Sequence, residues 1–560
     1  MKIYAFIYAL ICFVFYGCAT KQNKTNKPNI LFIMMDDLGY GQFGIYNDTI
    51  TTSDFNPYFV HLVDSLQGYS LNKSLEFSKR AIPELSRLAN DGVIFTKAFT
   101  SSNICAPSRM GIATGINQNI FGVYTNTDAE EGGLLPKTHL AENLKNNGYY
   151  TAHIGKWHIG RRNNRIVKDI LSRNNLDENI SFYTLKKSHP DIYKEIINSG
   201  YLGSVVDEHN PLNNGFTYYY GYNHWSCDFY NAKNVWENFN HVKNQREYNT
   251  DVFTDKAIEA INKSVDTGKP FYIQLHYHAV HDSLEPKAPE KYLKKFDSGS
   301  YDLDNFYAHV NAVDSNVKRI VDFLKSNNQY KNTLIVFTSD NGAMAAGSYN
   351  GDKTGSPLPG NTPFSGHKGT FFQGGFRVPM FLHWPNGIKN PKSVDLLIST
   401  MDILPTAIEV AEVTVPSVID GKSLFPILNG DDKPLHDHLI WSGIHSYKWG
   451  YLITKTTKTH GTESNYAPPA WVVVRGDYLL RFTGLLEKGI YKEHLGGRGP
   501  VLELFNIKND PAELYDLSKQ LPDLVNEMAA LYFKESHSFK PPIEWKKSKW
   551  EEMQVNPILK

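Results

Sequence analysis

Short apolar runs that alternate with helical stretches constrain the fold of this 560-residue chain more than any other feature. Five such runs, rich in β-branched or aromatic residues and followed by polar ones, cover 30–35, 149–154, 271–275, 334–338 and 378–383. Helical patterns cover 83–90, 140–146, 252–263 and 306–326. Buried strands that alternate with helices are typical of a mainly parallel sheet covered by helices. We therefore expect an α/β fold with one large sheet.

A second, smaller domain is expected toward the end of the chain. Two β-rich runs over 471–474 and 478–482 flank Gly476-Asp477, a dipeptide that favours a hairpin turn. A chain of this length buries one large core and leaves room for a smaller unit. The sequence predicts a large domain over 29–430 and a C-terminal α+β domain with an antiparallel sheet over 431–560.

The N-terminus predicts export. Lys2 precedes an apolar run over 3–16, which is too short to cross a bilayer as a stable span. Gly17 before Cys18 resembles a bacterial lipobox. Residues 1–17 would then be a lipoprotein signal peptide, with Cys18 as the lipidated first residue of the mature protein.

A second interpretation of the N-terminus stays open. Phe15 and Tyr16 are bulkier than the usual lipobox residues, so a conventional signal peptide cleaved near Ala19 is the alternative. In the first case residues 18–28 are a tether to a membrane, in the periplasm or at the outer-membrane surface. In the second case the protein is soluble in the periplasm or secreted.

The charge balance argues against one class of partner. Lys plus Arg and Asp plus Glu both number 58, so no overall field attracts nucleic acid. We expect no nucleic-acid partner. Binding of an anionic substrate must then depend on local charge.

Polar side chains directly follow two of the predicted strands. Asp36 and Asp37 follow the first strand, and Asp340 and Asn341 follow the fourth. The carboxyl ends of parallel strands meet at one edge, where ligands gather. Three carboxylates at one place repel one another unless a cation is bound, and all-oxygen ligands favour calcium or magnesium over zinc. A simple turn at each strand end is the alternative interpretation.

A cysteine stands at the expected start of a helix, in the segment Cys105-Ala106-Pro107-Ser108-Arg109, which Thr114-Gly115 follow. Pro107 suits the first turn of a helix, where free amide groups favour an anion. A buried helix-cap cysteine and the nucleophile of a Cys–His hydrolase are both compatible with this position alone. The whole pattern resembles the signature of the type I sulfatases, in which this cysteine is oxidised after synthesis to the nucleophile formylglycine.

Two further segments carry the resemblance. Residues 148–158 resemble the second sulfatase signature and include Lys156 and His158. Residues two apart on an extended segment point to one side, where a cation and a neutral imidazole can hold an anion and move a proton. His281 matches the histidine that the family places near the leaving-group oxygen. Two nearby residues compete for this assignment, His276 and His278.

The resemblance covers residues 28–421 and reappears over 504–511. Lys368 matches the second sulfate-holding lysine of the family. This chain departs from the family pattern at Val280, where proline is usual, and at Gln373, where glutamate is common. These departures leave the lysine assignment unchanged.

The resemblance implies an alkaline-phosphatase-like α/β fold and hydrolysis of a sulfate ester. The catalytic residues that it implies are Cys105, Arg109, Lys156, His158, His281 and Lys368. Together with the strand-end argument it implies one calcium ion, with magnesium less favoured, and the ligands Asp36, Asp37, Asp340, Asn341 and the oxidised residue 105. A formylglycine-generating or sulfatase-maturing enzyme is the partner that oxidation requires.

Sulfated sugars are the expected substrate. The chain resembles bacterial polysaccharide sulfatases, which implies oligosaccharides from algal polysaccharide or animal glycosaminoglycan. Candidate sugar-stacking residues are Trp225, Tyr230 and Trp236, although core packing is an alternative role for them. Three arginines in a polar segment, Arg161, Arg162 and Arg165, either face the pocket or form a solvated surface. The polar segments 47–79 and 161–210 are expected to be insertions near the pocket.

Two alternative functions remain. A phosphomonoesterase or phosphonate hydrolase of the same fold typically holds its substrate with two metals, whereas the sequence offers ligands for one. A sugar-binding lipoprotein whose Cys105 is never oxidised is the second alternative, but it has no use for a complete set of catalytic residues.

Overall fold

The structure is a computed structural model that describes residues 27–55, 60–61, 63–133, 140–243, 245–344, 356–444, 468–484 and 501–555. The predicted signal peptide, Cys18 and most of the predicted tether lie outside the described residues. In the described part of the chain, we find no helix whose length and apolarity would let it cross a membrane.

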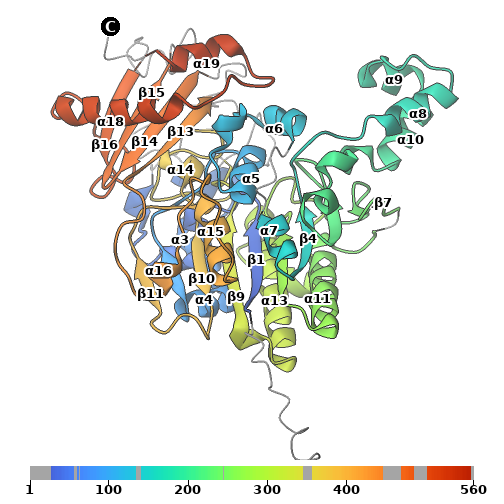
Figure 1. Cartoon of the computed structure of the whole chain (residues 1–560), viewed down its shortest axis with the longest axis horizontal. Coiled ribbons are helices and arrows are strands. Elements are labelled where there is room, and N and C mark those ends of the chain that lie inside the picture. The colour runs from blue at the N-terminus through green and yellow to red at the C-terminus, as the bar shows by residue number, and fades with distance from the viewer. Residues whose placement is uncertain are drawn as a thin grey trace, which may run out of the picture.

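A large twisted sheet forms the centre of the molecule (Figure 1). Ten strands of the described residues join in the order β11-β2-β10-β9-β1-β8-β4-β5-β6-β7. Their bounds are β1 Asn29–Met35, β2 Val93–Phe95, β4 Tyr150–Lys156, β5 Tyr218–Tyr222, β6 Trp236–Glu237, β7 Asn240–His241, β8 Phe271–His276, β9 Thr333–Ser339, β10 Met380–His383 and β11 Lys392–Val394. The strands from β9 to β5 are parallel, whereas β10 is antiparallel to both neighbours. The predicted mainly parallel sheet is confirmed.

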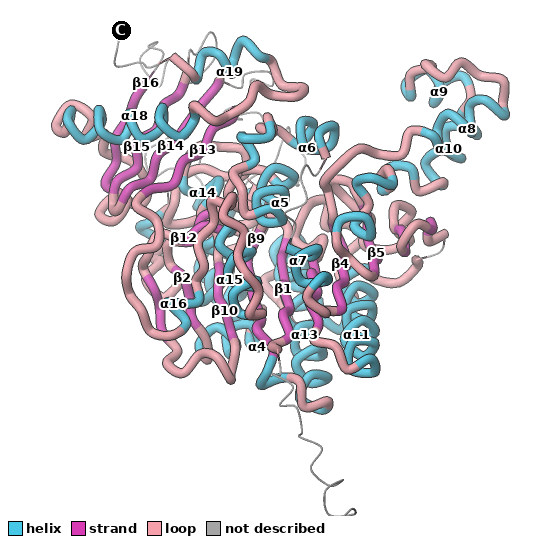
Figure 2. The backbone as a smooth tube through the Cα atoms, viewed as in Figure 1, coloured by secondary structure: helices cyan, strands magenta, loops and turns pink. Residues whose placement is uncertain are grey.

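Helices cover both faces of this sheet (Figure 2). All seven residues of β1 are buried, and the apolar residues 30–35 alternate between two cores. Leu31 and Ile33 lie in the core that is shared with α3 Leu71–Arg80, α4 Pro83–Asn90, α11 Asn249–Thr267 and α13 Tyr301–Ser326. Ile30 and Phe32 lie in the core that is shared with α5 Cys105–Thr114, α7 Leu140–Asn146 and α15 Ile403–Val410. A continuous apolar strand is what a sheet covered on both faces requires.

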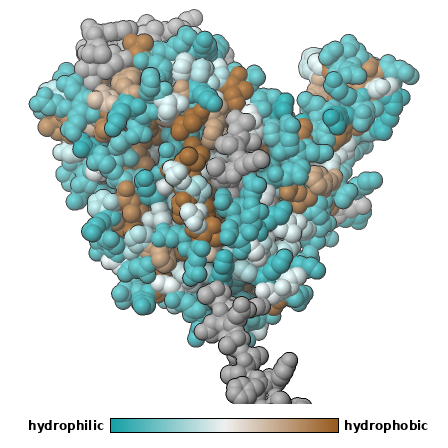
Figure 3. Space-filling view, in the orientation of Figure 1, coloured by the Kyte–Doolittle hydropathy of each residue, from teal (hydrophilic) through white to brown (hydrophobic). Residues whose placement is uncertain are grey.

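The two polar segments differ in how they pack. Leu71 and Phe77 of α3 are buried in the main core, so the end of segment 47–79 contributes to that core. Segment 161–210 instead contains an arm of three helices, α8 Arg165–Arg173, α9 Phe182–Ser188 and α10 Pro190–Asn198, with a small apolar cluster of its own. The arm projects from the body and its surface is mainly hydrophilic (Figures 1 and 3).

A separate antiparallel sheet lies near the C-terminus, as predicted. It contains β13 His438–Ile444, β14 Pro469–Arg475, β15 Tyr478–Thr483 and β16 Val501–Asn506, with the expected turn at Gly476-Asp477 between β14 and β15. One face packs on α18 Pro522–Ser536 and α19 Lys547–Met553. The other face contacts the large domain, where the Trp441 indole donates a hydrogen bond of 2.7 Å to the Thr100 carbonyl.

Further short α-helices and strands lie between these elements. The helices are α6 Asn126–Gly132, α12 Glu290–Leu293, α14 Gln373–Phe376 and α16 Phe425–Leu428. Strands β3 Ala98–Phe99 and β12 Ile398–Ser399 pair with each other. Gln373 of α14 connects the part of the chain that holds the large sheet with the part that holds the antiparallel sheet. Its backbone N–H donates a hydrogen bond of 2.8 Å to the Glu513 carboxylate.

Candidate active site

The predicted site residues converge at the carboxyl edge of the sheet. Asp36 and Asp37 follow β1, and Asp340 follows β9, which lies next to β1. The chain after β8 stays paired to the end of β1, since the Asp36 N–H donates to the Ala279 carbonyl at 3.0 Å. This pairing brings His281 to the same edge. The parallel sheet therefore explains how residues far apart in sequence meet.

Cys105 is the first residue of α5 and is buried among these side chains. One potential ligand atom from each of Asp36, Asp37, Cys105 and His281 lies within 4.8 Å of the others. Pro107 lies in the first turn of α5, as expected. These contacts place the cysteine at the centre of the predicted site rather than at an isolated helix cap.

Three buried ion pairs surround the cysteine. Lys156 Nζ lies 2.6 Å from Asp36 Oδ2, and Lys368 Nζ lies 2.7 Å from Asp37 Oδ1. The Arg109 guanidinium donates two hydrogen bonds to Asp340 Oδ2, at 2.8 and 3.0 Å. The three carboxylates are thus matched by three cations. The expected repulsion between the carboxylates is already relieved by these cations, so charge neutrality alone does not require a metal here.

The unpaired oxygen atoms of the site nevertheless fit a hard cation. Asp36 Oδ1 and Asn341 Oδ1 are buried acceptors without a hydrogen-bond partner among the described residues. Buried acceptors of this kind are costly unless something donates to them or coordinates them. Asp340 differs, because its oxygens accept from the Asp37 N–H and from Arg109. An all-oxygen set with two orphaned acceptors suits calcium or magnesium.

His281 is distinguished from its neighbours by its charge. Its Nε2 lies 3.7 Å from Asp37 Oδ2, and its Nδ1 lies 3.1 Å from Asp282 Oδ1. Burial and Lys368 lower its pKa, but Asp37 and Asp36 outweigh them and raise the pKa of His281 to about 10. Burial instead holds the pKa values of His276 and His278 well below the ordinary value. His281 is therefore the one of the three whose surroundings favour the protonated form.

The same cations act on the thiol. Burial alone would raise the pKa of Cys105, but Lys156, Lys368 and a hydrogen bond with His281 outweigh burial and lower it. A site that stabilises negative charge on residue 105 also stabilises an anion bound beside it.

His158 is held by a carboxylate that the sequence did not predict. Its Nε2 lies 3.3 Å from Glu130 Oε1 on α6, and Arg162 Nη2 lies 3.0 Å from Glu130 Oε2. Burial raises the pKa of Glu130, but His158 and Arg162 outweigh it and lower the pKa. Burial and Lys156 also lower the pKa of His158. The ionised Glu130 can only accept, so Nε2 donates and the buried Nδ1 keeps a free lone pair.

We expect Glu130→Ala to lower kcat for the ester hydrolysis that the sequence resemblance implies by about 10- to 100-fold with little change in KM, because the imidazole of His158 loses its fixed orientation. Glu130→Gln should recover part of the loss through its amide oxygen. Steady-state kinetics measure both variants against Glu131→Ala, which removes an exposed carboxylate from the adjacent position. Equal losses in the two alanine variants would contradict this role.

The aromatic candidates have separate roles. Trp225 is 49% exposed, and its ring centroid lies 6.1 Å from that of His281. Its carbonyl also accepts from Lys156 Nζ at 2.8 Å, so this residue lies at the site. Tyr230 packs against Tyr248, and Trp236 donates to the Gly200 carbonyl. Only Trp225 of the three therefore reaches the predicted centre among the described contacts.

The three candidate arginines also differ in their partners and positions. Arg162 pairs with Glu130 beside His158, whereas Arg161 pairs with the exposed Glu208. Arg165 is exposed at the start of α8.

The sequence missed two residues of the site. Asp282 was not predicted, although it adjoins His281 in sequence and this proximity could have identified it. Glu130 lies on a helix distant in sequence, and no sequence pattern identifies it.

Comparisons with known proteins agree with this geometry. The family model described as Sulfatase matches residues 28–413, and one described as "N-sulphoglucosamine sulphohydrolase, C-terminal" matches residues 367–460. The "Uncharacterized sulfatase YdeN" of Escherichia coli (strain K12) is 34% identical over 433 residues, which are 76% of this chain and 71% of the relative. The "N-acetylgalactosamine-6-sulfatase" of Canis lupus familiaris is 27% identical over 73% of this chain and 68% of the relative.

Solved structures share the fold. The crystal structure of Ps i-CgsB in complex with k-i-k-neocarrahexaose has a TM-score of 0.66 at 22% identity, covering 95% of this chain and 98% of that one. A structure solved with its substrate D-glucosamine-2-N,6-O-disulfate has a TM-score of 0.58 at 18% identity, covering 91% and 98%. The chain belongs to the sulfatase family and is a sulfuric ester hydrolase.

Proposed function

We propose that this protein hydrolyses sulfate esters of sulfated carbohydrates, using a formylglycine derived from Cys105. The observation that carries the proposal is the position of Cys105 between Lys156, Lys368 and His281, with Asp36 and Asp37 beside it. The carbohydrate part is supported by two similar proteins, one named N-acetylgalactosamine-6-sulfatase and one solved in complex with k-i-k-neocarrahexaose. The exposed ring of Trp225 beside His281 suits a sugar.

Each of these residues has a separate role in the proposed reaction. One hydroxyl of the hydrated formylglycine at position 105 releases its proton to solvent, and the resulting oxyanion attacks sulfur while Lys156 and Lys368 neutralise charge that grows on the sulfate oxygens. Protonated His281 gives its proton to the departing alcohol oxygen. The second hydroxyl of the hydrate then loses a proton to His158, expels sulfate and restores the aldehyde. No water has to attack the sulfated enzyme.

Asp36, Asp37, Asp340 and Asn341, with residue 105, are the proposed holders of one calcium ion, with magnesium as the less favoured ion. The ion supplies positive charge for the sulfate oxygens when it is bound. The unpaired Asp36 Oδ1 and Asn341 Oδ1 support this assignment. Arg109 keeps Asp340 in position through its two hydrogen bonds.

Maturation and location are parts of the same proposal. A formylglycine-generating or sulfatase-maturing enzyme must oxidise Cys105 before the protein is active. The N-terminal sequence supports export, with lipidation at Cys18 as the proposed anchor to a membrane and release as a soluble protein as the alternative.

Sulfate release from a panel of sulfated algal and animal oligosaccharides tests the proposal, with a steroid sulfate and phosphate monoesters as comparison substrates. The protein is made together with a formylglycine-generating enzyme, and mass spectrometry confirms conversion at residue 105. We expect release of sulfate from at least one sugar. Release from the steroid alone would contradict the carbohydrate class, and faster release of phosphate would contradict the sulfatase reaction.

A further inference from the structure

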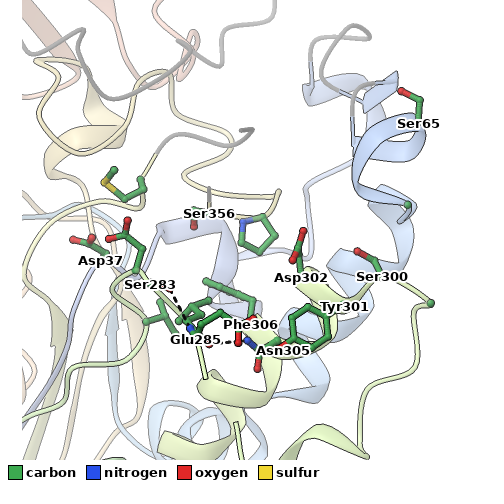
Figure 4. A pocket seen from close by; sticks show the side chains of 17 residues that line it. Asp37, Ser65, Ser283, Glu285, Ser300, Tyr301, Asp302, Asn305, Phe306 and Ser356 are labelled. Carbon is green, nitrogen blue, oxygen red and sulfur yellow. Dashed lines mark hydrogen bonds between the residues drawn. The ribbon is translucent and has the colours of Figure 1, made fainter. Parts of the chain in front are cut away.

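The approach to the proposed proton donor is open. Val280 and Asp282, the two neighbours of His281 in sequence, line a cavity of about 580 Å³, and Asp37 forms one edge of it (Figure 4). The start of α13 forms another part of the wall. Since His281 gives its proton to the leaving oxygen in the proposed reaction, the sugar that leaves must lie beside this histidine. The side chains around His281 therefore decide which leaving group fits.

Trp225 presents an exposed aromatic ring beside His281. The two ring centroids are 6.1 Å apart, and Trp225 is 49% exposed. Its indole N–H donates to no acceptor among the described residues, whereas the indole of Trp236 donates to the Gly200 carbonyl at 3.0 Å. A tryptophan with a structural role usually has a partner for this group when it is buried. The indole of Trp225 therefore keeps both an apolar face and a donor for a ligand.

The loop that carries Trp225 is fixed before a ligand binds. The imidazole of His224, which is buried, lies with its centroid 5.0 Å from the indole and supports it. The side-chain amide of Asn223 donates to a carbonyl of a neighbouring loop at 2.8 Å, and that of Asn249 donates at 3.0 Å to the carbonyl three residues after Trp225. A ring that is held in this way costs a ligand little ordering on binding.

The backbone of Trp225 has a role separate from that of its ring. Its carbonyl accepts from Lys156 Nζ at 2.8 Å, beside the ion pair of this lysine with Asp36. Residue 225 is thus in contact with the proposed sulfate-holding lysine through its backbone and next to the proposed proton donor through its ring. Because a substitution of the side chain keeps the carbonyl, it tests the ring separately from the sulfate position.

We propose that Trp225 is the platform on which the leaving sugar stacks, so that the enzyme selects cyclic sugars that present an uncovered C–H face. The inference rests on the proposed function and specifies how that site recognises its substrate. The C–H groups on one side of a sugar ring pack on an aromatic face, and the indole N–H can donate to a sugar hydroxyl. A sugar with a bulky group on that face cannot stack, and an acyclic alcohol offers no face.

Kinetics of Trp225→Ala test the platform with three probes: the oligosaccharide that releases sulfate fastest, 4-nitrophenyl sulfate, whose flat ring can take the same place, and inorganic sulfate as a competitor without a ring. We expect KM for both esters to rise by about tenfold with little change in kcat, because the stacking contact is lost. The inhibition constant of inorganic sulfate should stay unchanged. Trp225→Phe keeps an aromatic face and should recover most of the loss.

Phe239→Ala is the matched control. Phe239 is 48% exposed, nearly as much as Trp225, but it lies in the turn between β6 and β7 at one end of the large sheet. This variant should leave all three constants unchanged. An unchanged KM in Trp225→Ala would overturn the inference. A KM that rises together with the inhibition constant of sulfate would also overturn it, because the substitution would then act through Lys156. Absence of sulfate release from every ester despite complete formylglycine would instead overturn the proposed function.

Discussion

Cys105→Ala is expected to lower kcat/KM for sulfate release by at least about 10⁴-fold, the largest effect of any single substitution in this chain. Alanine cannot be oxidised to formylglycine, so no group remains at position 105 to attack sulfur. Lys156, Lys368 and His281 stay in place, which means that the variant should still bind the substrate. Sulfate release and equilibrium binding, measured on the same preparation, separate the two effects.

Cys227→Ala is the control for this experiment. Cys227 is the other free cysteine of the described chain, and it is also buried, but it lies in the main apolar core. Burial raises the pKa of its thiol, in contrast to that of Cys105. We expect Cys227→Ala to retain activity at a cost of some stability. Activity in Cys105→Ala comparable to that of Cys227→Ala would show that residue 105 is not the nucleophile.

Asp37→Asn is expected to weaken calcium binding by at least about 100-fold and to lower activity in parallel. Asp37 faces Lys368, His281 and Asn341, so an uncharged amide removes the negative charge that would attract the proposed calcium ion and that raises the pKa of His281. The substitution also leaves Lys368 buried with one partner fewer, which lowers stability. The rise in Tm on addition of calcium, rather than activity alone, therefore measures the loss of the ion site.

Asp314→Asn provides the comparison for Asp37→Asn. Asp314 is a buried carboxylate on α13 outside the site, and its Oδ1 accepts from the Leu85 N–H at 2.8 Å. Burial raises its pKa to about 7, so an amide resembles its neutral form. This variant should keep the full rise in Tm with calcium. An undiminished calcium response in Asp37→Asn would contradict the proposed ligand set.

Much of the fold could be predicted because its signals are local. The strand β1 is one continuous apolar run, and α4 and α7 have the bounds that the sequence predicts. The longer helix α13 begins at Tyr301 rather than at the predicted residue 306, and Leu303 in its first turn already belongs to the buried apolar face. The antiparallel pairing of β10 was not visible, since strand direction depends on the path of the connecting chain.

The site was predictable in its residues but not in its pairing. Motifs identify Lys156, Lys368 and Arg109, yet their partners are carboxylates that follow β1 and β9, and only the folded sheet shows that the charges pair. Glu130 and the cavity beside α13 depend on contacts between distant segments and leave no periodic signal. Sequence therefore predicts the chemistry of this site better than its shape.

The relation between formylglycine content and activity tests the central claim most directly. Preparations made with increasing amounts of the formylglycine-generating enzyme contain increasing fractions of oxidised residue 105, which mass spectrometry of the peptide around it quantifies. We expect kcat for sulfate release to rise in proportion to this fraction and to extrapolate to zero when Cys105 is unmodified. Full activity in unmodified protein, or no sulfate release from any sulfate ester after complete conversion, would contradict the formylglycine mechanism.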